Sequence, residues 1–234
     1  MARQGTTREF KVFGSNALRL AMLSCFPAFE RAHGLTVAVE FAATNHTLER
    51  MRRGDTADLI IVTSAAIAEL AGAGKIIADS CVDLATAGVG ACVRAGAPKP
   101  DISTVEALKR TLLDAKSVSY SRAGQSGVHF AKMIVQLGIA DMVNAKAVIN
   151  PSGLVGEVIA RGDAELGFQQ VSEILAVSEV DLVGPLPDAV QLNSVFAAGI
   201  GTGSEYMVQA RALIRELQSP TTADTMRKSG LTPI

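Results

Sequence analysis

Short apolar runs alternate along the chain with stretches whose apolar residues recur every three or four positions. Residues 10–13 form the first apolar run, which predicts a strand. The stretch 17–31 predicts a helix, because Leu18, Met22 and Phe26 would share one helical face. This alternation continues to the end of the chain, so the elements can be read in order.

The remaining elements follow from the same two patterns. Further strands are predicted over 35–41, 57–62, 88–93, 117–120, 145–149, 166–168, 180–183 and 195–199. Further helices are predicted over 48–53, from 64 onward, and over 103–113, 128–137, 154–161 and 205–218. The run 57–62 is apolar without alternation, which is typical of a strand buried on both faces of a parallel sheet. Strands that alternate with helices predict an α/β fold with mainly parallel strands.

Composition narrows the class of function. The chain has 234 residues, of which 48% are hydrophobic and 19% charged, so it has enough apolar chain for one large domain or two small ones and is not a disordered protein. Its net charge of −1 gives no positive field for collecting nucleic acid. No apolar stretch approaches the roughly 18–20 residues of a membrane span. We therefore expect no nucleic-acid partner and no membrane-spanning segment.

The N-terminal segment and the cysteines predict the cellular compartment and whether a metal site is expected. No leader-like apolar run follows the first ten residues, and the three cysteines, Cys25, Cys81 and Cys92, are too few and too scattered for a disulfide framework or a zinc site. We expect all three to be buried, reduced thiols, which predicts a cytoplasmic protein without a metal or cofactor. The alternative is a periplasmic protein whose leader has been removed, in which case an ABC transporter permease becomes a partner.

Small polar residues occupy five strand-to-helix turns. They lie at residues 14–16, 44–46, 63–64, 124–127 and 152–153. Each turn places hydroxyls and unpaired backbone N–H groups at a helix N-terminus, which attracts anions. In open α/β sheets such turns also lie at the carboxyl ends of the strands, where ligands bind. The simpler interpretation is that Ser, Thr and Asn are common helix caps.

The order of short motifs carries a resemblance to a known family. The motifs are Val12–Leu18, Phe41–Leu48, Gly54–Leu59, Gln125–Val128, Gly167–Gln170 with Glu173–Ile174, and Gly230–Leu231. In this order the chain resembles the molybdate-binding, ModA-like branch of the type II periplasmic solute-binding proteins, over nearly its whole length. The resemblance implies two α/β lobes joined by two crossing strands, with a ligand cleft between them. Lobe 1 is expected to take residues 1–86 and 199–234, and lobe 2 residues 87–198.

The resemblance also implies a set of ligand-binding positions, and this chain departs from it. The family holds a tetrahedral oxyanion with two serine hydroxyls, a tyrosine hydroxyl and three backbone N–H groups. Here Ala17 stands at the first serine position and Gln170 at the tyrosine position, while Arg122 adds a guanidinium that suits a carboxylate. The candidate ligand-binding residues are Ser15, Asn16, Thr44, Asn45, Thr63, Ser64, Arg122, Ser126, Ser152 and Gln170.

Several functions fit this scaffold. The leading prediction is reversible binding of a small anion, with a carboxylate favoured over molybdate. The alternative is a cofactor-independent isomerase of a small tricarboxylate, similar to aconitate isomerase, in which His46 or His129 moves the proton. The missing leader favours the isomerase, and the lack of a conspicuous acid–base pair disfavours it. Molybdate or tungstate binding, and an anion sensor, remain further alternatives.

Overall fold

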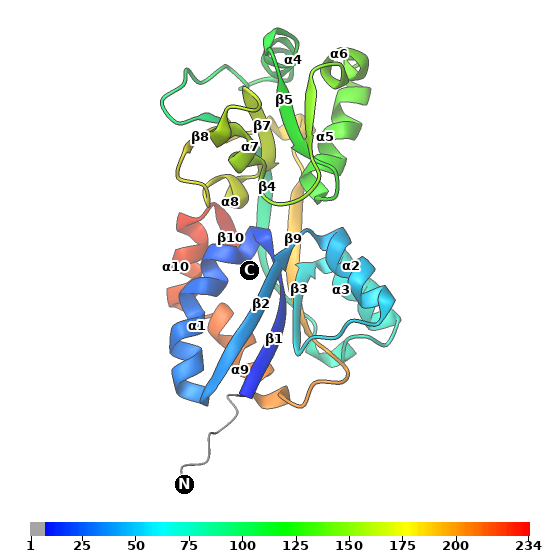
Figure 1. Ribbon diagram of the computed structural model, residues 1–234, viewed down its shortest axis with the longest axis vertical. Coiled ribbons are helices and arrows are strands. Elements are labelled where there is room, and N and C mark those ends of the chain that lie inside the picture. The colour runs from blue at the N-terminus through cyan, green and yellow to red at the C-terminus, as the bar shows by residue number, and fades with distance from the viewer. Residues whose placement is uncertain (1–7) are drawn as a thin grey trace.

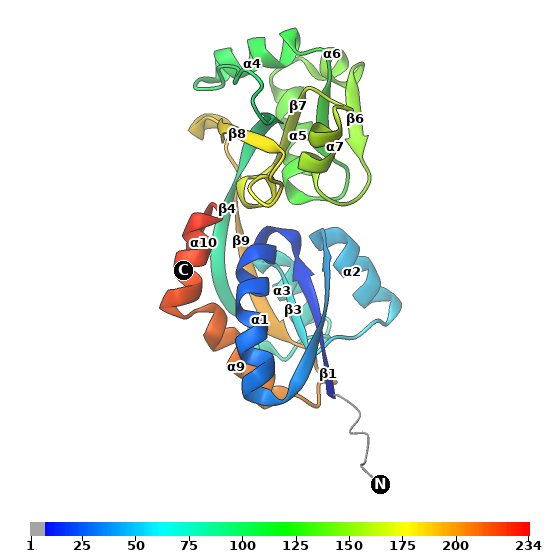
Figure 2. The same ribbon diagram turned by 60° about the vertical axis from the view of Figure 1, so that its left-hand side comes forward.

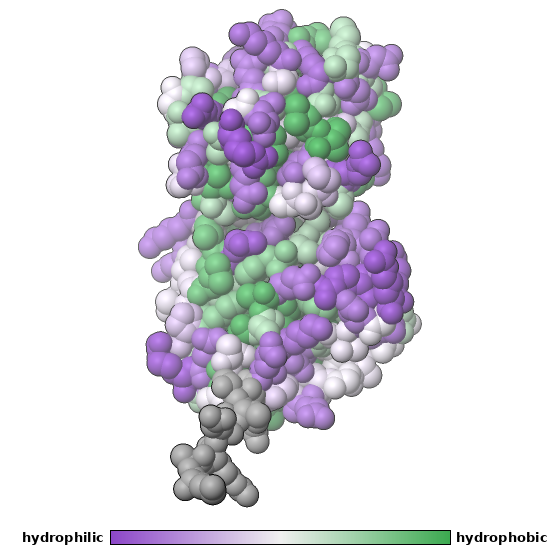
Figure 3. Space-filling model, in the orientation of Figure 1, coloured by the Kyte–Doolittle hydropathy of each residue, from purple (hydrophilic) through white to green (hydrophobic). Residues whose placement is uncertain are grey.

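The structure is a computed structural model that describes residues 8–234, arranged as two lobes stacked along the long axis (Figure 1). Two segments run between the lobes, the strand β4 (Val82–Arg94) and the chain that leads into β9 (Asn193–Ile200) (Figure 2). The molecular surface narrows where the lobes meet (Figure 3). This is the fold class that the sequence predicted.

Lobe 1 is a sheet with helices on both faces. Its strand order is β2-β1-β3-β9-β4, with β10 paired to β4. The strands are β1 (Arg8–Ser15), β2 (Leu35–Ala42), β3 (Leu59–Thr63), β9, the first half of β4, and β10 (Leu231–Pro233). The helices are α1 (Arg19–His33), α2 (Thr44–Arg53), α3 (Ser64–Gly72), α9 (Met207–Leu217) and α10 (Pro220–Lys228), with short 3-10 turns η1 (Asn16–Leu18) and η2 (Ala78–Ser80).

Alternating side chains of the central strands build two cores in lobe 1. Val12 and Ile61 face the core shared with α1, α9 and α10, whereas Phe13 and Ile60 face the core shared with α2 and α3. Both faces are apolar because both are covered, which explains why β3 shows no alternation in the sequence.

Lobe 2 repeats the same layered plan. Its sheet runs β4-β7-β5-β6, with β8 also paired to β4. The strands are the second half of β4, β5 (Val118–Ser121), β6 (Ala147–Asn150), β7 (Leu166–Gln170) and β8 (Val180–Pro185). The helices are α4 (Val105–Asp114), α5 (Gln125–Gln136), α6 (Ala140–Asn144), α7 (Val155–Arg161) and α8 (Val171–Ile174), and the 3-10 turn η3 (Asp188–Val190) leads back toward lobe 1.

The crossing point is fixed by two glutamine side chains. β4 pairs with β9 up to Gly88 and with β7 from Val89. Gln191, in the second crossing segment, accepts from the Val89 N–H at 2.8 Å and donates to the Val89 carbonyl at 3.0 Å. Gln170, with its NH₂ group turned toward β4, donates to the Gly88 carbonyl at 3.0 Å. The two crossing segments are thus bonded to one another where the lobes meet.

The structure differs from the sequence-based expectations in several elements. The sheets are mixed, because every pair that involves β4 or β9 is antiparallel. The second crossing lies before Asn193, because β9 pairs along its length with lobe 1 strands, whereas the expected boundary followed residue 198. The short helices α6, α8 and α10 were not predicted.

The expectation that all three cysteines are buried was wrong for Cys81, which is exposed just before β4, whereas Cys25 and Cys92 are buried. Within residues 8–234 no helix has the length and apolar character needed to cross a bilayer. Across the same residues, no three His, Cys, Asp or Glu side chains gather in a group that could hold a metal ion.

Candidate functional site

One cavity between the lobes holds a cationic side chain. It encloses about 230 Å³ and takes its walls from both lobes. Its lining residues are Asn16, Arg19, Glu40, Phe41, Ala42, Ala43 and His46 from lobe 1, and Ser121, Ala123, Pro151, Ser152, Gly153, Leu154 and Glu157 from lobe 2. We call it the arginine cavity, after Arg19.

A second cavity between the lobes lies against the ends of two helices. It encloses about 290 Å³ and is lined by Thr63, Ser64, Ala65, Gln125, Leu192, Ser194 and Val195. Thr63 to Ala65 begin α3, Gln125 begins α5, and the other residues belong to the second crossing segment and β9. We call it the helix-end cavity.

The helices that begin at these cavities lack side-chain caps. The residues before α2, α3 and α5 are Ala43, Thr63 and Gly124, and none of them forms a side-chain hydrogen bond to its helix. Among the other helices, α4 and α10 are capped by Thr104 and Ser219, whereas α1, α6, α7, α8 and α9 also lack a side-chain cap. Capping therefore does not explain the polar turns of α2, α3 and α5, whose first N–H groups remain available to an anion.

Three turn hydroxyls form hydrogen bonds that shape the cavity walls instead. Ser15 accepts a hydrogen bond from the Ala17 N–H at 3.3 Å and so orders the η1 turn. Ser121 accepts from the Gly124 N–H at 3.0 Å and orders the loop before α5. Ser64, at the start of α3, donates its hydroxyl hydrogen to Asp83 at 2.8 Å. These bonds hold the backbone of the turns in place.

Arg19 is the cation of the arginine cavity. It is the first residue of α1, and its guanidinium lies over the Phe41 ring, with Cζ 4.5 Å from the ring centroid. Its Nε is buried without a hydrogen-bond partner, and no carboxylate among residues 8–234 lies within ion-pair distance of the side chain. A buried donor without a protein partner is rare, and a ligand or an ordered water in the cavity would satisfy it. A cation at a helix N-terminus is also opposed by the helix dipole.

Two carboxylates line the same cavity in different states. Glu40 is paired with Arg50, which also bonds Asp55. Glu157, in the first turn of α7, forms no ion pair within the part of the chain that the structure describes, and its carboxylate lies close over Gly153. The Glu40 charge is therefore offset, while Glu157 remains an acidic group on the lobe 2 wall.

The two candidate histidines lie in different surroundings. His46 is exposed in the first turn of α2 and lines the arginine cavity. His129 is half-buried on α5, and its Nε2 lies 2.7 Å from the Val190 carbonyl. His129 bonds the second crossing segment and lines neither cavity between the lobes. Of the two, only His46 is placed to contact a ligand there.

The structure divides the other predicted ligand-binding residues into three groups. Asn16 and Ser152 line the arginine cavity, and Thr63 and Ser64 line the helix-end cavity. Ser15, Thr44, Ser126 and Gln170 are buried, and Asn45 is half-buried, without lining either cavity.

Arg122 has an exposed side chain that lines neither cavity, so the guanidinium in the cleft is that of Arg19. Gln170 was expected at the ligand and instead bonds β4 and Ser194 at the crossing point. A buried amide at this position therefore joins the lobes.

Arg19 was missed in the sequence because it falls inside a predicted helix. One signal pointed to it, since an arginine one turn after Asn16 is a basic residue at a helix start, where acidic residues are favoured. Glu157 shares this difficulty, because an acidic residue in the first turn of a helix is ordinary. Its place in the cleft depends on the fold.

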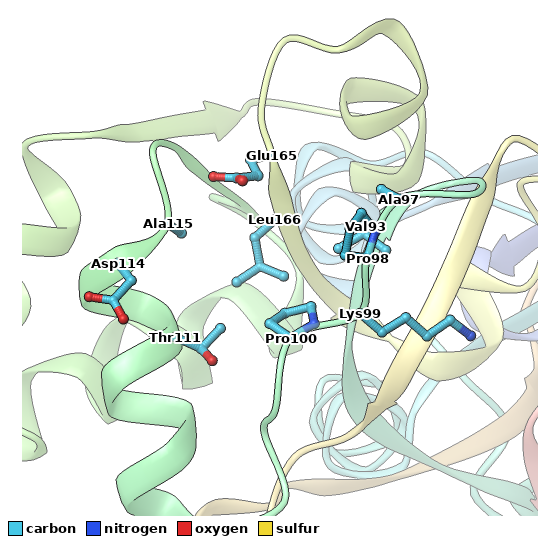
Figure 4. Close-up of a pocket in the computed structure, with 10 residues that line it drawn as sticks. All are labelled: Val93, Ala97, Pro98, Lys99, Pro100, Thr111, Asp114, Ala115, Glu165 and Leu166. Atoms are coloured by element: carbon cyan, nitrogen blue, oxygen red, sulfur yellow. The ribbon is translucent and has the colours of Figure 1, made fainter.

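A third cavity lies away from the cleft, at the far end of lobe 2 (Figure 4). It encloses about 380 Å³ between the β4–α4 loop, the end of α4 and the start of β7. The Lys99 side chain points away from Asp114 and Glu165, so these charges do not converge on one point (Figure 4). This cavity lacks the focused charge of the cleft.

Comparison with known proteins gives the family. Residues 10–232 match the family described as bacterial extracellular solute-binding protein. The chain belongs to this family. Solute-binding proteins of this kind take a small-molecule ligand, which agrees with cavities walled by both lobes.

The names of individual relatives describe different activities and ligands. An aconitate isomerase from a Pseudomonas species is 35% identical over 229 residues, which span 95% of this chain and 87% of that protein. The periplasmic molybdate-binding protein of Azotobacter vinelandii has a TM-score of 0.78 at 16% identity, over 95% of this chain and 98% of that one. The sulfate-binding protein SubI of Mycobacterium tuberculosis H37Rv has a TM-score of 0.72 at 17% identity, over 97% and 87%. The two structures share the fold.

Proposed function

We propose that this solute-binding protein homologue is an isomerase of a small tricarboxylate of the aconitate class, acting by proton transfer alone. The observation that carries the proposal is the unpaired guanidinium of Arg19 in a cavity shared by both lobes. The similarity to an aconitate isomerase over 95% of the chain supports the substrate class. Simple reversible binding of a carboxylate, which the sequence favoured, becomes the second candidate.

The cleft offers several separate positions for negative charge. Arg19 supplies a full charge and a planar fork that matches a carboxylate. The uncapped start of α2 lies at the arginine cavity, and the uncapped starts of α3 and α5 lie at the helix-end cavity. A ligand with several carboxylates spread over a short carbon chain uses these positions better than a compact tetrahedral oxyanion does.

The proposed step is a shift of one proton and one double bond. A base removes a proton from the methylene carbon of the tricarboxylate, the double bond moves by one carbon, and a proton is returned to the former vinyl carbon. The substrate and product have the same atoms and electrons, so no other reactant is needed. His46 is the group in the arginine cavity best suited to carry the proton.

The cation of the cavity has a second role in this step. Removal of the proton spreads negative charge onto a neighbouring carboxylate, which becomes enolate-like. A guanidinium already placed against that carboxylate stabilises the developing charge without rearrangement. The Phe41 ring on which Arg19 rests keeps the guanidinium in one orientation.

The test is turnover of trans-aconitate in D₂O, followed by proton NMR. We expect formation of cis-aconitate together with deuterium incorporation at carbon. His46→Ala should lower kcat by about a hundredfold or more, as is typical for loss of a general base. His129→Ala serves as the matched control, since that ring bonds the Val190 carbonyl and lines neither cavity.

Binding without turnover would overturn the isomerase proposal. If calorimetry detects trans-aconitate binding that depends on Arg19 while NMR detects neither product nor exchange, reversible carboxylate binding is the function. Turnover that survives His46→Ala would instead remove His46 from the proposed role.

A further inference from the structure

One buried acidic residue has no part in the proposed step. Glu173 lies in α8 and is buried beside the crossing point, directly after the strand β7 that carries Gln169 and Gln170. Helix α8 packs against β4, β7, β8 and α7, and also against η1 of the other lobe. In Figure 1 it lies at the base of the upper lobe, above α1 and α10. A carboxyl group buried here calls for a reason.

The contacts of Glu173 lead to the wall of the arginine cavity. The Gln170 backbone N–H and the Gln169 side chain both face the Glu173 carboxyl and lower its pKa. The Gln169 side chain in turn accepts, through Oε1, a bond of 2.7 Å from the Val155 N–H. Val155 is the first residue of α7, whose own preceding residue, Leu154, provides no side-chain cap. Gln169 therefore supplies that helix with the cap that its sequence lacks.

The orientation of the Gln169 amide depends on Glu173. An amide offers a carbonyl oxygen on one side and an NH₂ group on the other, and only the oxygen can accept from Val155. An acceptor at Glu173 takes the NH₂ group and so turns the oxygen toward α7. Without that acceptor, the reversed amide would place donor against donor at Val155. Burial of Gln169, which is 2% exposed, leaves no water to compensate.

We propose that Glu173 is a positioning residue, which acts through Gln169 to hold the start of α7 and with it the lobe 2 wall of the arginine cavity. That wall consists of the loop before α7 and of Glu157 in its first turn. The proposal rests on the proposed function only for the identity of the ligand. The position of α7 can be measured whether or not the protein is an isomerase.

The uncharged state of Glu173 fits this role. Burial raises the pKa of Glu173 to about 7, against the opposing effect of the Gln170 backbone N–H and the Gln169 side chain. No residue in the described chain forms an ion pair with it. The elements packed against α8 carry the following charged or titratable groups: Asp83, Cys92 and Arg94 on β4, Asp181 on β8, and Glu157 and Arg161 on α7. None of them is among the causes of the shift.

The test compares three variants by affinity for tricarballylate, an unreactive tricarboxylate, and by hydrogen exchange at the Val155 amide. Glu173→Leu and Gln169→Leu should each weaken binding by about tenfold or more, since a misplaced cavity wall has effects of this size. Both should speed exchange at Val155. Glu173→Gln keeps an acceptor oxygen and should restore affinity and protection to within about threefold of the wild type.

Ser172→Ala is the matched control, because Ser172 lies in the same helix, is also buried and has no hydrogen-bond partner. It should leave affinity and Val155 exchange unchanged. The proposal is overturned if Glu173→Leu folds with wild-type Val155 protection, or if Ser172→Ala disturbs the site as much. If Glu173→Leu fails to fold, Gln169→Leu decides by the same two measurements. If the wild type does not bind tricarballylate, the proposed substrate class fails, while Val155 exchange still tests the positioning role.

Discussion

At the scale of single residues, Arg19 is where charge and helix geometry are in conflict. The guanidinium lies at the start of α1, where the helix dipole disfavours it, and one buried nitrogen lacks a partner. Arg19→Ala should weaken tricarballylate binding by about tenfold or more, because it leaves a carboxylate unpaired in a partly buried site. Titration calorimetry measures this loss, with Arg122→Ala as the control from the lobe 2 surface.

The same substitution should not harm the fold. Removing an unpaired cation from a helix start relieves an unfavourable interaction of about 0.3–1 kcal/mol. Loss of the Arg19–Phe41 contact costs a similar amount, so the free energy of unfolding of ligand-free Arg19→Ala, from urea denaturation, should stay within about 1 kcal/mol of the wild type. A larger loss of affinity in Arg122→Ala than in Arg19→Ala would contradict this prediction. It would mean that Arg122, in the loop before α5, binds the carboxylate as the sequence analysis expected.

Glu173 gives a pH dependence of stability that can be assigned to one group. Its pKa is about 7 in the folded protein, against 4.5 as the ordinary value, so the folded state holds the proton more tightly. The stability that this group contributes is present below pH 4.5 and is lost as the pH rises through about 7. In Glu173→Gln the side chain cannot ionise, so this loss of stability with rising pH does not occur. Between pH 5 and pH 8 its unfolding free energy should gain on the wild type by roughly 3 kcal/mol.

Urea denaturation of both proteins at the two pH values measures this difference. Ser172→Ala, from the same helix, should follow the wild type. A constant difference between Glu173→Gln and wild type across the range would mean that Glu173 is already ionised at pH 5.

The sequence could identify site residues whose position follows from a neighbouring strand, but it could not identify those whose role depends on distant parts of the fold. Asn16, Thr63, Ser64 and Ser152 lie at or just after the carboxyl ends of strands, where ligands bind in open α/β sheets, and all four line a cavity between the lobes. Arg19 could not be identified in the same way, because its candidate role depends on the lack of a hydrogen-bond partner for its buried Nε. An unpaired buried nitrogen is a property of the folded molecule.

At the scale of elements, α5 is held against β5 by a glycine. A Cβ on Gly127 would lie 1.7 Å from the Ser121 carbonyl oxygen, whereas one on Gly124 would meet the Ser121 hydroxyl at 3.1 Å. Gly127→Ala must therefore push the start of α5 away from the strand, and should destabilise the protein by about 3 kcal/mol or more. Gly124→Ala, in the same loop, should have a much smaller effect.

Urea denaturation gives both values, and tricarballylate affinity gives the effect on the site. Because α5 begins at the helix-end cavity, Gly127→Ala should weaken binding even at a temperature where it remains folded. Equal stability of the two variants would show that α5 tolerates displacement, contrary to the tight contact with Ser121.

The elements themselves were predicted best where apolar periodicity runs longest. α1, β1, β2, β3 and β9 appear where the pattern placed them, whereas β10 and the lobe 1 half of β4 were not predicted. The four-residue α8 and the five-residue α6 are too short for a helical period to be recognised. α10 was missed because it buries few residues, among them Thr222 and Met226, so it lacks an apolar face. β4 was predicted too short because it serves both sheets.

At the scale of the whole molecule, the lobes are joined at few points. The hydrogen bonds that link their sheets run through β4, and the side chains of Gln170 and Gln191 fasten the second crossing segment. The mixed sheets follow from this connectivity, since a strand that crosses between lobes runs against the strands it meets. Sequence periodicity identified the strands but carried no information on their direction.

A ligand that touches both walls of the arginine cavity adds a third connection between the lobes. Tricarballylate at 100 times its dissociation constant should stabilise the folded chain by about 2.7 kcal/mol. For a chain of this size that corresponds to an increase in Tm of about 5–11 °C, measured by differential scanning calorimetry. The transition should also sharpen, because lobes bridged by a ligand unfold together. Molybdate should give a smaller shift, since it lacks the spread of charge that the cleft offers. At the same tricarballylate concentration, Arg19→Ala should lose about half of this shift or more while keeping its own Tm, because a tenfold weaker affinity leaves only about 1.4 kcal/mol of stabilisation. A molybdate shift equal to that of tricarballylate, and unchanged in Arg19→Ala, would instead make this cleft an oxyanion site built from helix ends alone.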